Sequence, residues 1–342
     1  MDGRSDGIAM PGPDLNERAA PYQAGFTRRW GHLHNPHVRA LAWLLDSPDL
    51  LDPAAAEWAG KLAAPTPITA DLREWLDRLE RDPAPLLAAL GARPHTRLGL
   101  YAEQLMAFYY QAHGRLVAHG LQVRASRNDT VGEFDFLLEL EGDGEGARAA
   151  GVEHIELATK FYLLQGDAAS RFDTLIGPNL ADSLGAKMRK ILGKQLALAD
   201  HPAAQALLAR PVLRARALVK GWLFYPAPAT PMAGIASGHC RGFWCPLAAV
   251  PGMAAADWVI LPRLQWLAPY RIEADAALLD GAGLADAVAA AFALSPAPVM
   301  VASMASMAAS TGAAPGELVE QCRGFIVPDD WQARALQRQQ GL

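Results

Sequence analysis

Two short stretches of the chain carry charged residues at the spacing that directs side chains to one face of a β-strand. The stretch GEFDFLLEL, residues 132–140, contains Asp135, and HIELATKFYLL, residues 154–164, contains Glu156 and, four positions later, Lys160. If the two strands pair, the two carboxylates converge and their repulsion favours a bound cation. Oxygen ligands suit Mg²⁺ or Mn²⁺, and a lysine on the same face can orient or deprotonate a metal-bound water.

A locally basic segment follows these strands. Between residues 187 and 220 there are eight Lys or Arg and one Asp, in a chain whose net charge is −5. The expected helical stripe consists of Lys187, Lys190 and Lys194, and the expected strand face consists of Arg214, Arg216 and Lys220. A basic strip beside two carboxylates predicts a cleft for a polyanionic backbone, in which the bases hold phosphates. A solubilising surface would carry the same pattern.

The elements that must position these residues alternate between helical and strand periodicity. The expected elements are a helix over Arg97–Val117, strands over Leu121–Ala125, Val131–Leu140 and Val152–Leu163, a helix over Asn179–Ala199 and a strand over Arg214–Tyr225. This order predicts an α/β fold with a mixed sheet. Around it we expect a flexible tail (1–25), a helical extension (26–96), the core itself (97–225) and a C-terminal α+β extension (226–342). In that extension, strands are expected over 242–245, 258–261 and 264–270, and helices over 284–294 and 315–322.

The order and the acidic residues resemble the PD-(D/E)XK phosphodiesterase superfamily, which has a restriction-endonuclease-like fold. Asp135 in GEFD and Glu156 in HIELATK match its two acidic positions. The resemblance implies a magnesium site formed by these carboxylates and the backbone carbonyl of Leu157. Recombination-type members add a Glu on the first helix and a Gln on the later helix, matched here by Glu103 in LYAEQL and Gln195 in LGKQL. The whole chain also resembles an uncharacterised bacterial family of unknown function that shares the runs EFDFLL, ELA-KFYL and IGPN.

The lysine of the motif departs from the superfamily pattern. That pattern places Lys two residues after the acid, about 6–7 Å along a strand, whereas this chain has Ala158 there. Lys160 lies about 13 Å from Glu156 along an ideal strand. The alternatives are a bulge that shortens this gap, a lysine from the next helix such as Lys187 or Lys194, or an inactive site.

The resemblance implies a metal-dependent nuclease that hydrolyses phosphodiester bonds in DNA or RNA, with DNA favoured. The expected catalytic residues are Asp135, Glu156 and Lys160, Glu103 is an additional metal ligand, and Lys187, Lys190, Lys194 and Gln195 bind the substrate. The alternative is a catalytically inactive nuclease-fold protein that binds nucleic acid or a protein partner. His154, on the acidic face, is expected to be a hydrogen-bonded structural histidine, and the alternative is a residue that supports the metal ligands from behind. The sequence leaves open endonuclease or exonuclease action, strand preference and homodimer formation.

Composition limits the other function classes. The chain is 51% hydrophobic and 20% charged, as expected of a soluble protein with a sizeable core, and its net charge of −5 excludes a uniformly basic surface. An odd set of three cysteines argues against a disulfide framework. Cys240 and Cys245, beside His239, lack a second ligand pair for zinc. Without a secretory signal or a bilayer-length apolar stretch, we expect a cytoplasmic protein that does not contact a membrane.

Overall fold

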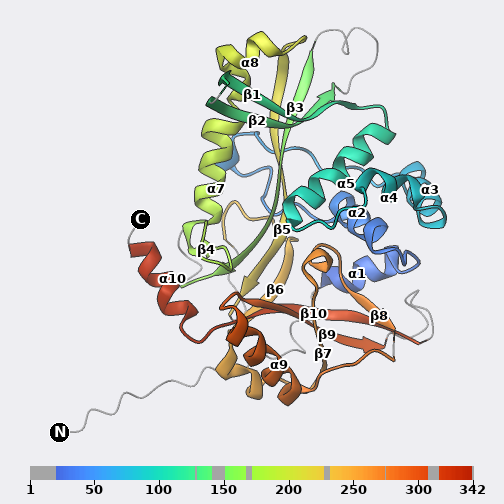
Figure 1. Cartoon of the computed structure of the whole chain (residues 1–342), viewed down its shortest axis with the longest axis vertical. Coiled ribbons are helices and arrows are strands. Elements are labelled where there is room, and N and C mark those ends of the chain that lie inside the picture. The colour runs from blue at the N-terminus through green and yellow to red at the C-terminus, as the bar shows by residue number, and fades with distance from the viewer. Residues whose placement is uncertain are drawn as a thin grey trace.

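Ten strands of the chain form one mixed sheet with helices on both sides (Figure 1). The computed structural model describes residues 21–127, 129–140, 151–166, 172–226, 232–273, 275–306 and 316–340. Residues 1–20 of the expected tail lie outside this set. Residues 21–25 belong to a helix, α1 (Pro21–Trp30), so the tail is shorter than expected.

The strands follow one another across the sheet in the order β1-β2-β3-β5-β6-β10-β9-β7, with β4 beside β3 and β8 beside β10. Their bounds are β1 Leu116–Ser126, β2 Asp129–Glu139, β3 Val152–Leu164, β4 Leu175–Ile176, β5 Val212–Tyr225, β6 Cys240–Pro246, β7 Asp257–Ile260, β8 Arg271–Glu273, β9 Val299–Ser306 and β10 Glu317–Val327. Strands β3, β5, β6 and β10 are parallel to their neighbours within that group. The flanking pairs are antiparallel, so the C-terminal strands continue the sheet that β1 to β5 begin.

The helices cover the two faces of the sheet. The other α-helices are α2 Pro36–Asp46, α3 Ala70–Arg81, α4 Ala84–Leu90, α5 Leu98–Ala112, α7 Leu184–Lys190, α8 Pro202–Leu207, α9 Gly281–Leu294 and α10 Trp331–Gln340. Helices α1 to α5 confirm that the segment before the strands is helical. A π-helical turn, η3 (Ile191–Gln195), continues α7. Figure 1 shows α5 and α7 on opposite sides of β3 and β5.

The expected helices and strands follow one another in the expected order from α5 to β5, with β4 and α8 as additional elements, but two boundaries were wrong. Helix α5 ends at Ala112, because Gly114 takes a positive φ of 64° that turns the chain out of the helix. Strand β1 therefore starts at Leu116, inside the expected helix. Helix α7 begins after Ser183, whose side chain accepts a hydrogen bond from the amide of Ala186, and not at the expected Asn179.

Two further assignments in the C-terminal extension were wrong. The expected helix over 315–322 is strand β10, which lies between β6 and β9 and is buried over most of its length. The expected strand over 264–270 is a short 3₁₀ turn, η6 (Arg263–Gln265), and a connection to β8. Short apolar runs are compatible with either period, so the neighbouring strands decided the structure of β10. Strand β9 was not expected.

The apolar residues of β3 alternate between two hydrophobic layers, one on each face of the sheet. This alternation shows on which face each polar residue of β3 lies. Ile155, Leu157 and Leu163 pack in the layer that includes α1 to α5. Ala158 and Tyr162 pack in the layer that includes α7. Since side chains two apart share a face, Glu156 and Lys160 face α7.

Candidate functional site

Asp135 and Glu156 come together where β2 and β3 separate. The antiparallel register ends at Phe136 opposite Ile155, so the next position faces Asp135 toward Glu156. The Leu157 amide donates a 2.9 Å hydrogen bond to Oδ2 of Asp135. The side chain of Asp135 thus accepts a hydrogen bond from a β3 backbone amide, and the two carboxyl groups are close enough for their charges to interact. The structure therefore brings both predicted acids onto one site.

Burial dominates the electrostatics of the two acids. Glu156 is 1% exposed, and burial followed by the charge of Asp135 raises its pKa to about 8. Burial likewise raises the pKa of Asp135 to about 6, although the Leu157 amide opposes the shift. Two buried carboxyl groups in contact cannot both ionise without cost, and a divalent cation removes that cost.

Glu103, on α5, is close enough to Asp135 for the two charges to interact. Burial, and then the charge of Asp135, raises its pKa to about 7. Across the described parts of the chain, no group of three or more His, Cys, Asp or Glu side chains is placed to hold a metal ion. One or two carboxylates are the usual protein contribution to a Mg²⁺ site.

Lys187 and Gln195 reach Glu156 from the opposite side. The Lys187 ammonium lies 3.6 Å from Oε1 of Glu156 and donates a 3.0 Å hydrogen bond to the Gln195 side-chain oxygen. The Gln195 amide donates to the same Glu156 oxygen. Burial lowers the pKa of Lys187, and Glu156 partly restores it. These three side chains form one connected polar group.

The π-helical turn explains how Gln195 meets Lys187. Residues eight apart lie about 80° from each other around a regular α-helix. The turn over Ile191–Gln195 contains an extra residue, and the Leu196 amide bonds back to the Ile191 carbonyl. This wider turn carries Gln195 back over the stripe of Lys187. Such turns inside helices occur frequently at functional sites.

Lys160 is held elsewhere. Its ammonium donates a 3.0 Å hydrogen bond to Oδ2 of Asp182, and the Tyr162 hydroxyl donates to the same oxygen at 3.2 Å. No bulge brings Lys160 back to Glu156, and Lys187 is the lysine that contacts Glu156. Asp182 escaped the sequence reasoning because it lies in the connection before α7, and only the fold brings it to β3.

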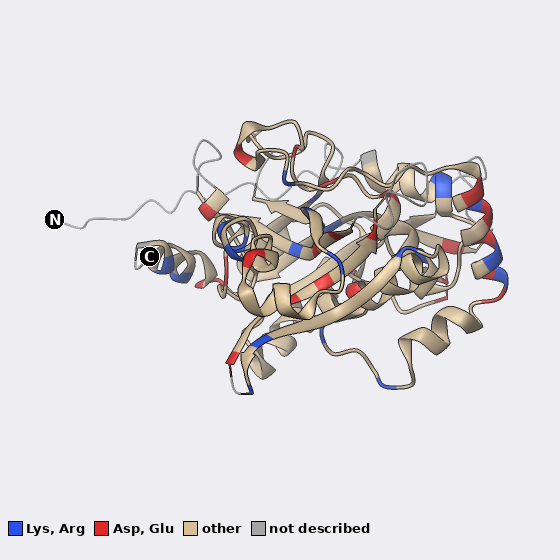
Figure 2. Ribbon diagram, turned by 90° about the horizontal axis from the view of Figure 1, so that it is seen from above, with Lys and Arg blue, Asp and Glu red and all other residues tan. Residues whose placement is uncertain are grey.

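The basic segment does not form the expected continuous strip. Six of its eight cations pair with acids: Lys187 with Glu156, Arg189 with Asp173, Arg210 with Glu139, Arg214 and Arg216 with Glu153, and Lys220 with Asp49. The strand face of Arg214, Arg216 and Lys220 also lies on the α5 side of the sheet, since their neighbours Leu218 and Trp222 pack there. Figure 2 shows acidic and basic positions interleaved through the middle of the molecule.

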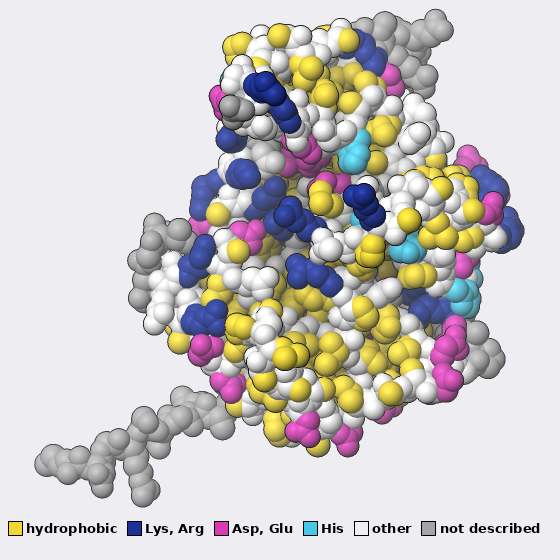
Figure 3. Space-filling model, in the orientation of Figure 1, with side chains coloured by type: hydrophobic (Ala, Val, Ile, Leu, Met, Phe, Trp, Pro, Cys, Tyr) yellow, Lys and Arg dark blue, Asp and Glu magenta, His cyan; other side chains and the backbone are white. Residues whose placement is uncertain are grey.

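The helical stripe remains as the basic surface nearest the acids. Lys190 and Lys194 are exposed, and neither forms a salt bridge with a carboxylate among the described residues. Lys190 is close enough to Lys187 to lower its pKa through charge repulsion. Figure 3 shows basic side chains gathered over α7, beside acidic side chains.

His154 differs from its expected role as a hydrogen-bonded structural residue. The side chain is fully buried, and its ring packs edge-on against Phe134 at 4.8 Å. Neither ring nitrogen has a hydrogen-bond partner in the described part of the chain. Burial lowers the pKa of His154 to about 4, so the imidazole is neutral at pH 7 and carries one N–H donor.

The three cysteines are buried free thiols, in agreement with the absence of a disulfide framework. His239 does not combine with Cys240 and Cys245. Its ring nitrogens contact the Tyr225 hydroxyl at 2.7 Å and the Ala236 carbonyl at 2.5 Å.

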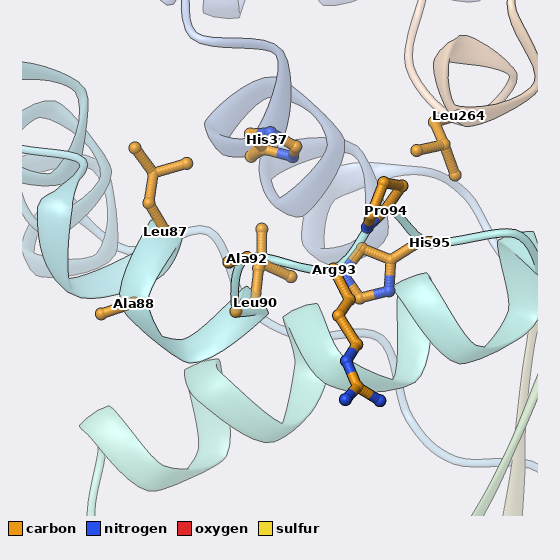
Figure 4. Close-up of a pocket in the computed structure, with 10 residues that line it drawn as sticks. His37, Leu87, Ala88, Leu90, Ala92, Arg93, Pro94, His95 and Leu264 are labelled. Atoms are coloured by element: carbon orange, nitrogen blue, oxygen red, sulfur yellow. The ribbon is translucent and has the colours of Figure 1, made fainter.

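A separate pocket of about 580 Å³ lies between α2, α4, the 91–95 connection and η6 (Figure 4). Its described lining is mostly apolar and contains His37, Arg93 and His95 but no carboxylate. Nδ1 of His37 lies 2.8 Å from the Tyr101 hydroxyl. The pocket therefore lacks the oxygen ligands that distinguish the Asp135–Glu156 site.

Comparison with known proteins identifies a family but no function. No curated protein and no solved structure matches the chain significantly. Among the helices that the structure describes, none is long and apolar enough to cross a membrane. Residues 39–327 match the family described as Domain of unknown function (DUF1853). Because this match spans most of its length, the chain belongs to the DUF1853 family.

Proposed function

We propose that the chain is a metal-dependent nuclease that hydrolyses phosphodiester bonds. The observation that carries the proposal is the adjacency of two carboxyl groups, the half-buried Asp135 and the buried Glu156, with the Lys187 ammonium 3.6 Å from Glu156. Adjacent acids with strongly raised pKa values are costly to maintain and are concentrated at functional sites. The order of elements from α5 to β5 supports a restriction-endonuclease-like core for this part of the chain.

The donor set fits Mg²⁺ or Mn²⁺. Asp135 and Glu156 would hold the ion, with Glu103 and the Leu157 carbonyl as additional oxygen donors. Oε2 of Glu156 is buried and has no hydrogen-bond partner in the described structure, so it is available as a ligand. When bound, Mg²⁺ supplies Lewis-acid polarisation of the phosphoryl group and lowers the pKa of the attacking water.

Lys187 takes the role that the superfamily gives to the motif lysine. Its side chain is 17% exposed, so its charge is little screened, and it would stabilise the negative charge that develops on the phosphoryl oxygens. When a metal ion binds, the Gln195 amide would give up its hydrogen bond to Glu156 and help to orient the side chains that hold the ion. Lys160 is tied to Asp182 and has no catalytic role in this proposal.

Nucleic acid is the proposed substrate. Lys190 and Lys194 are exposed beside Lys187 and would contact phosphates that flank the cleaved bond. The resemblance to restriction-endonuclease-like enzymes favours DNA over RNA. The cations on β5 are assigned no substrate contact, since they face the α5 side of the sheet and pair there with Glu153 or Asp49.

A second candidate is a nucleic-acid-binding protein without hydrolytic activity. Two observations favour it: Ala158 stands where the motif lysine belongs, and Gln195 and Lys187 occupy Oε1 of Glu156. This candidate predicts salt-sensitive binding with no cleavage under any divalent metal.

The test compares wild-type protein with Asp135→Asn and with a matched control, Asp129→Asn, an exposed residue of the same strand. Supercoiled plasmid, single-stranded DNA and RNA are incubated with Mg²⁺, Mn²⁺ or EDTA. The nuclease proposal expects metal-dependent cleavage by wild type and the control, and at least a 100-fold loss in Asp135→Asn. Equal cleavage by Asp135→Asn would show that the activity arises elsewhere. Binding without cleavage supports the second candidate.

A further inference from the structure

His154 lies next to the acids, but its environment is that of a packing residue. It precedes Glu156 by two positions on the same face of β3, and it pairs across the sheet with Leu137. Its neighbours are the ring of Phe134 and the apolar layer around Leu137 and Val152. An apolar side chain would fill this place without leaving buried polar atoms unpaired.

Three unpaired polar atoms meet at this point. They are both ring nitrogens of His154 and Oε2 of Glu156. Nε2 of His154 lies 3.9 Å from Oε2 of Glu156, about 1 Å beyond hydrogen-bond distance. A small rotation of the Glu156 side chain would pair the imidazole with the carboxylate. In the observed arrangement, Gln195 and Lys187 draw the other oxygen of Glu156 toward α7.

We propose that His154 is a positioning residue that donates a hydrogen bond from Nε2 to Oε2 of Glu156 when this carboxylate turns to hold a divalent cation. The inference rests on the proposed function, because it assigns Glu156 as a ligand. Glu156 then has two resting places, one on Gln195 and Lys187 and one against His154. The imidazole fixes the plane of the carboxylate from the buried side, as outer residues commonly do for metal ligands.

The experiment measures Mn²⁺ binding by calorimetry and metal-free thermal stability in EDTA. His154→Phe keeps an aromatic ring beside Phe134 but removes both nitrogens, and His154→Gln keeps an N–H donor. His119→Phe is the matched control, because His119 stacks on Phe136 at 5.2 Å on the far side of β2. Asp135→Asn reports on the metal site itself. His154→Leu replaces the Phe variant if that variant does not fold.

We expect His154→Phe to weaken Mn²⁺ binding about 10- to 100-fold, while its melting temperature stays equal or rises because unpaired buried nitrogens are removed. His154→Gln recovers part of the affinity, and His119→Phe leaves it unchanged. Wild-type affinity in His154→Phe, or a loss that His154→Gln does not reduce, overturns the positioning role while leaving the metal site intact. Absence of Mn²⁺ binding in wild type, or unchanged binding in Asp135→Asn, overturns the proposed function and the inference with it.

Discussion

The buried carboxyl of Glu156 should make the metal-free protein less stable as the pH rises. In the folded chain its pKa is raised from the ordinary 4.5 to about 8, first by burial and then by Asp135. Between these values the unfolded chain releases a proton that the folded chain keeps. The folded state therefore binds more protons, and the free energy of unfolding falls as pH increases. Glu156→Gln removes this group and should reduce the slope, while Asp135 and Glu103, whose pKa values are also raised, keep part of it.

The size of the effect follows from the difference between the two pKa values. A rise from 4.5 to about 8 corresponds to about 5 kcal/mol at 1.36 kcal/mol per pH unit. Asp135 and Glu156 interact, so part of this free energy belongs to the pair and not to Glu156 alone. We therefore expect wild type to lose about 2–5 kcal/mol relative to Glu156→Gln between pH 5 and pH 8.

Urea denaturation in EDTA at pH 5, 6, 7 and 8 measures this difference. Comparing slopes with pH avoids the constant effect of losing the Lys187 and Gln195 contacts in the variant. Glu74→Gln, at an exposed helix position, is the matched control and should retain the wild-type slope. Saturating Mg²⁺ should restore stability to wild type at pH 8, by about 2.7 kcal/mol at 100 times the dissociation constant. Parallel pH profiles for wild type and Glu156→Gln would refute the reasoning.

Three further predictions concern the neighbouring residues. Lys187→Met should raise the pKa of Glu156 further, because the ammonium lowers it, and should reduce cleavage about 100-fold; a pH-rate profile that does not move would contradict this role. Replacing Lys190 and Lys194 with Gln should reduce the salt slope of DNA binding by about 2 in anisotropy titrations, and an unchanged slope would place the nucleic acid elsewhere. Gly221→Ala should destabilise the fold by several kcal/mol, because an added Cβ would lie 1.8 Å from the Lys160 carbonyl oxygen; wild-type thermal stability would show that β3 and β5 can separate freely.

The sequence by itself determined the order of elements from α5 to β5 and the face that carries the acids. The period-two alternation in β2 and β3 is a property of the local sequence. It is a clear signal because a strand with one buried face needs an apolar residue at every second position. Once two such strands pair, the alternation fixes the face of the sheet on which Asp135 and Glu156 lie. For the same reason the helical extension before α5 was correctly predicted from its three- and four-residue steps.

Only the tertiary structure decided which lysine meets the acids and which cations stay free. Lys160 lies on the expected face, yet Asp182 comes from a connection whose position no local pattern encodes. Gln195 reaches Glu156 because a π-helical turn shifts its angle around the helix axis. The cations on β5 form ion pairs with acids distant in sequence. Ion pairs and helix irregularities depend on which surfaces come within a few ångströms of each other after folding. The spacing of residues along the chain does not predict those contacts.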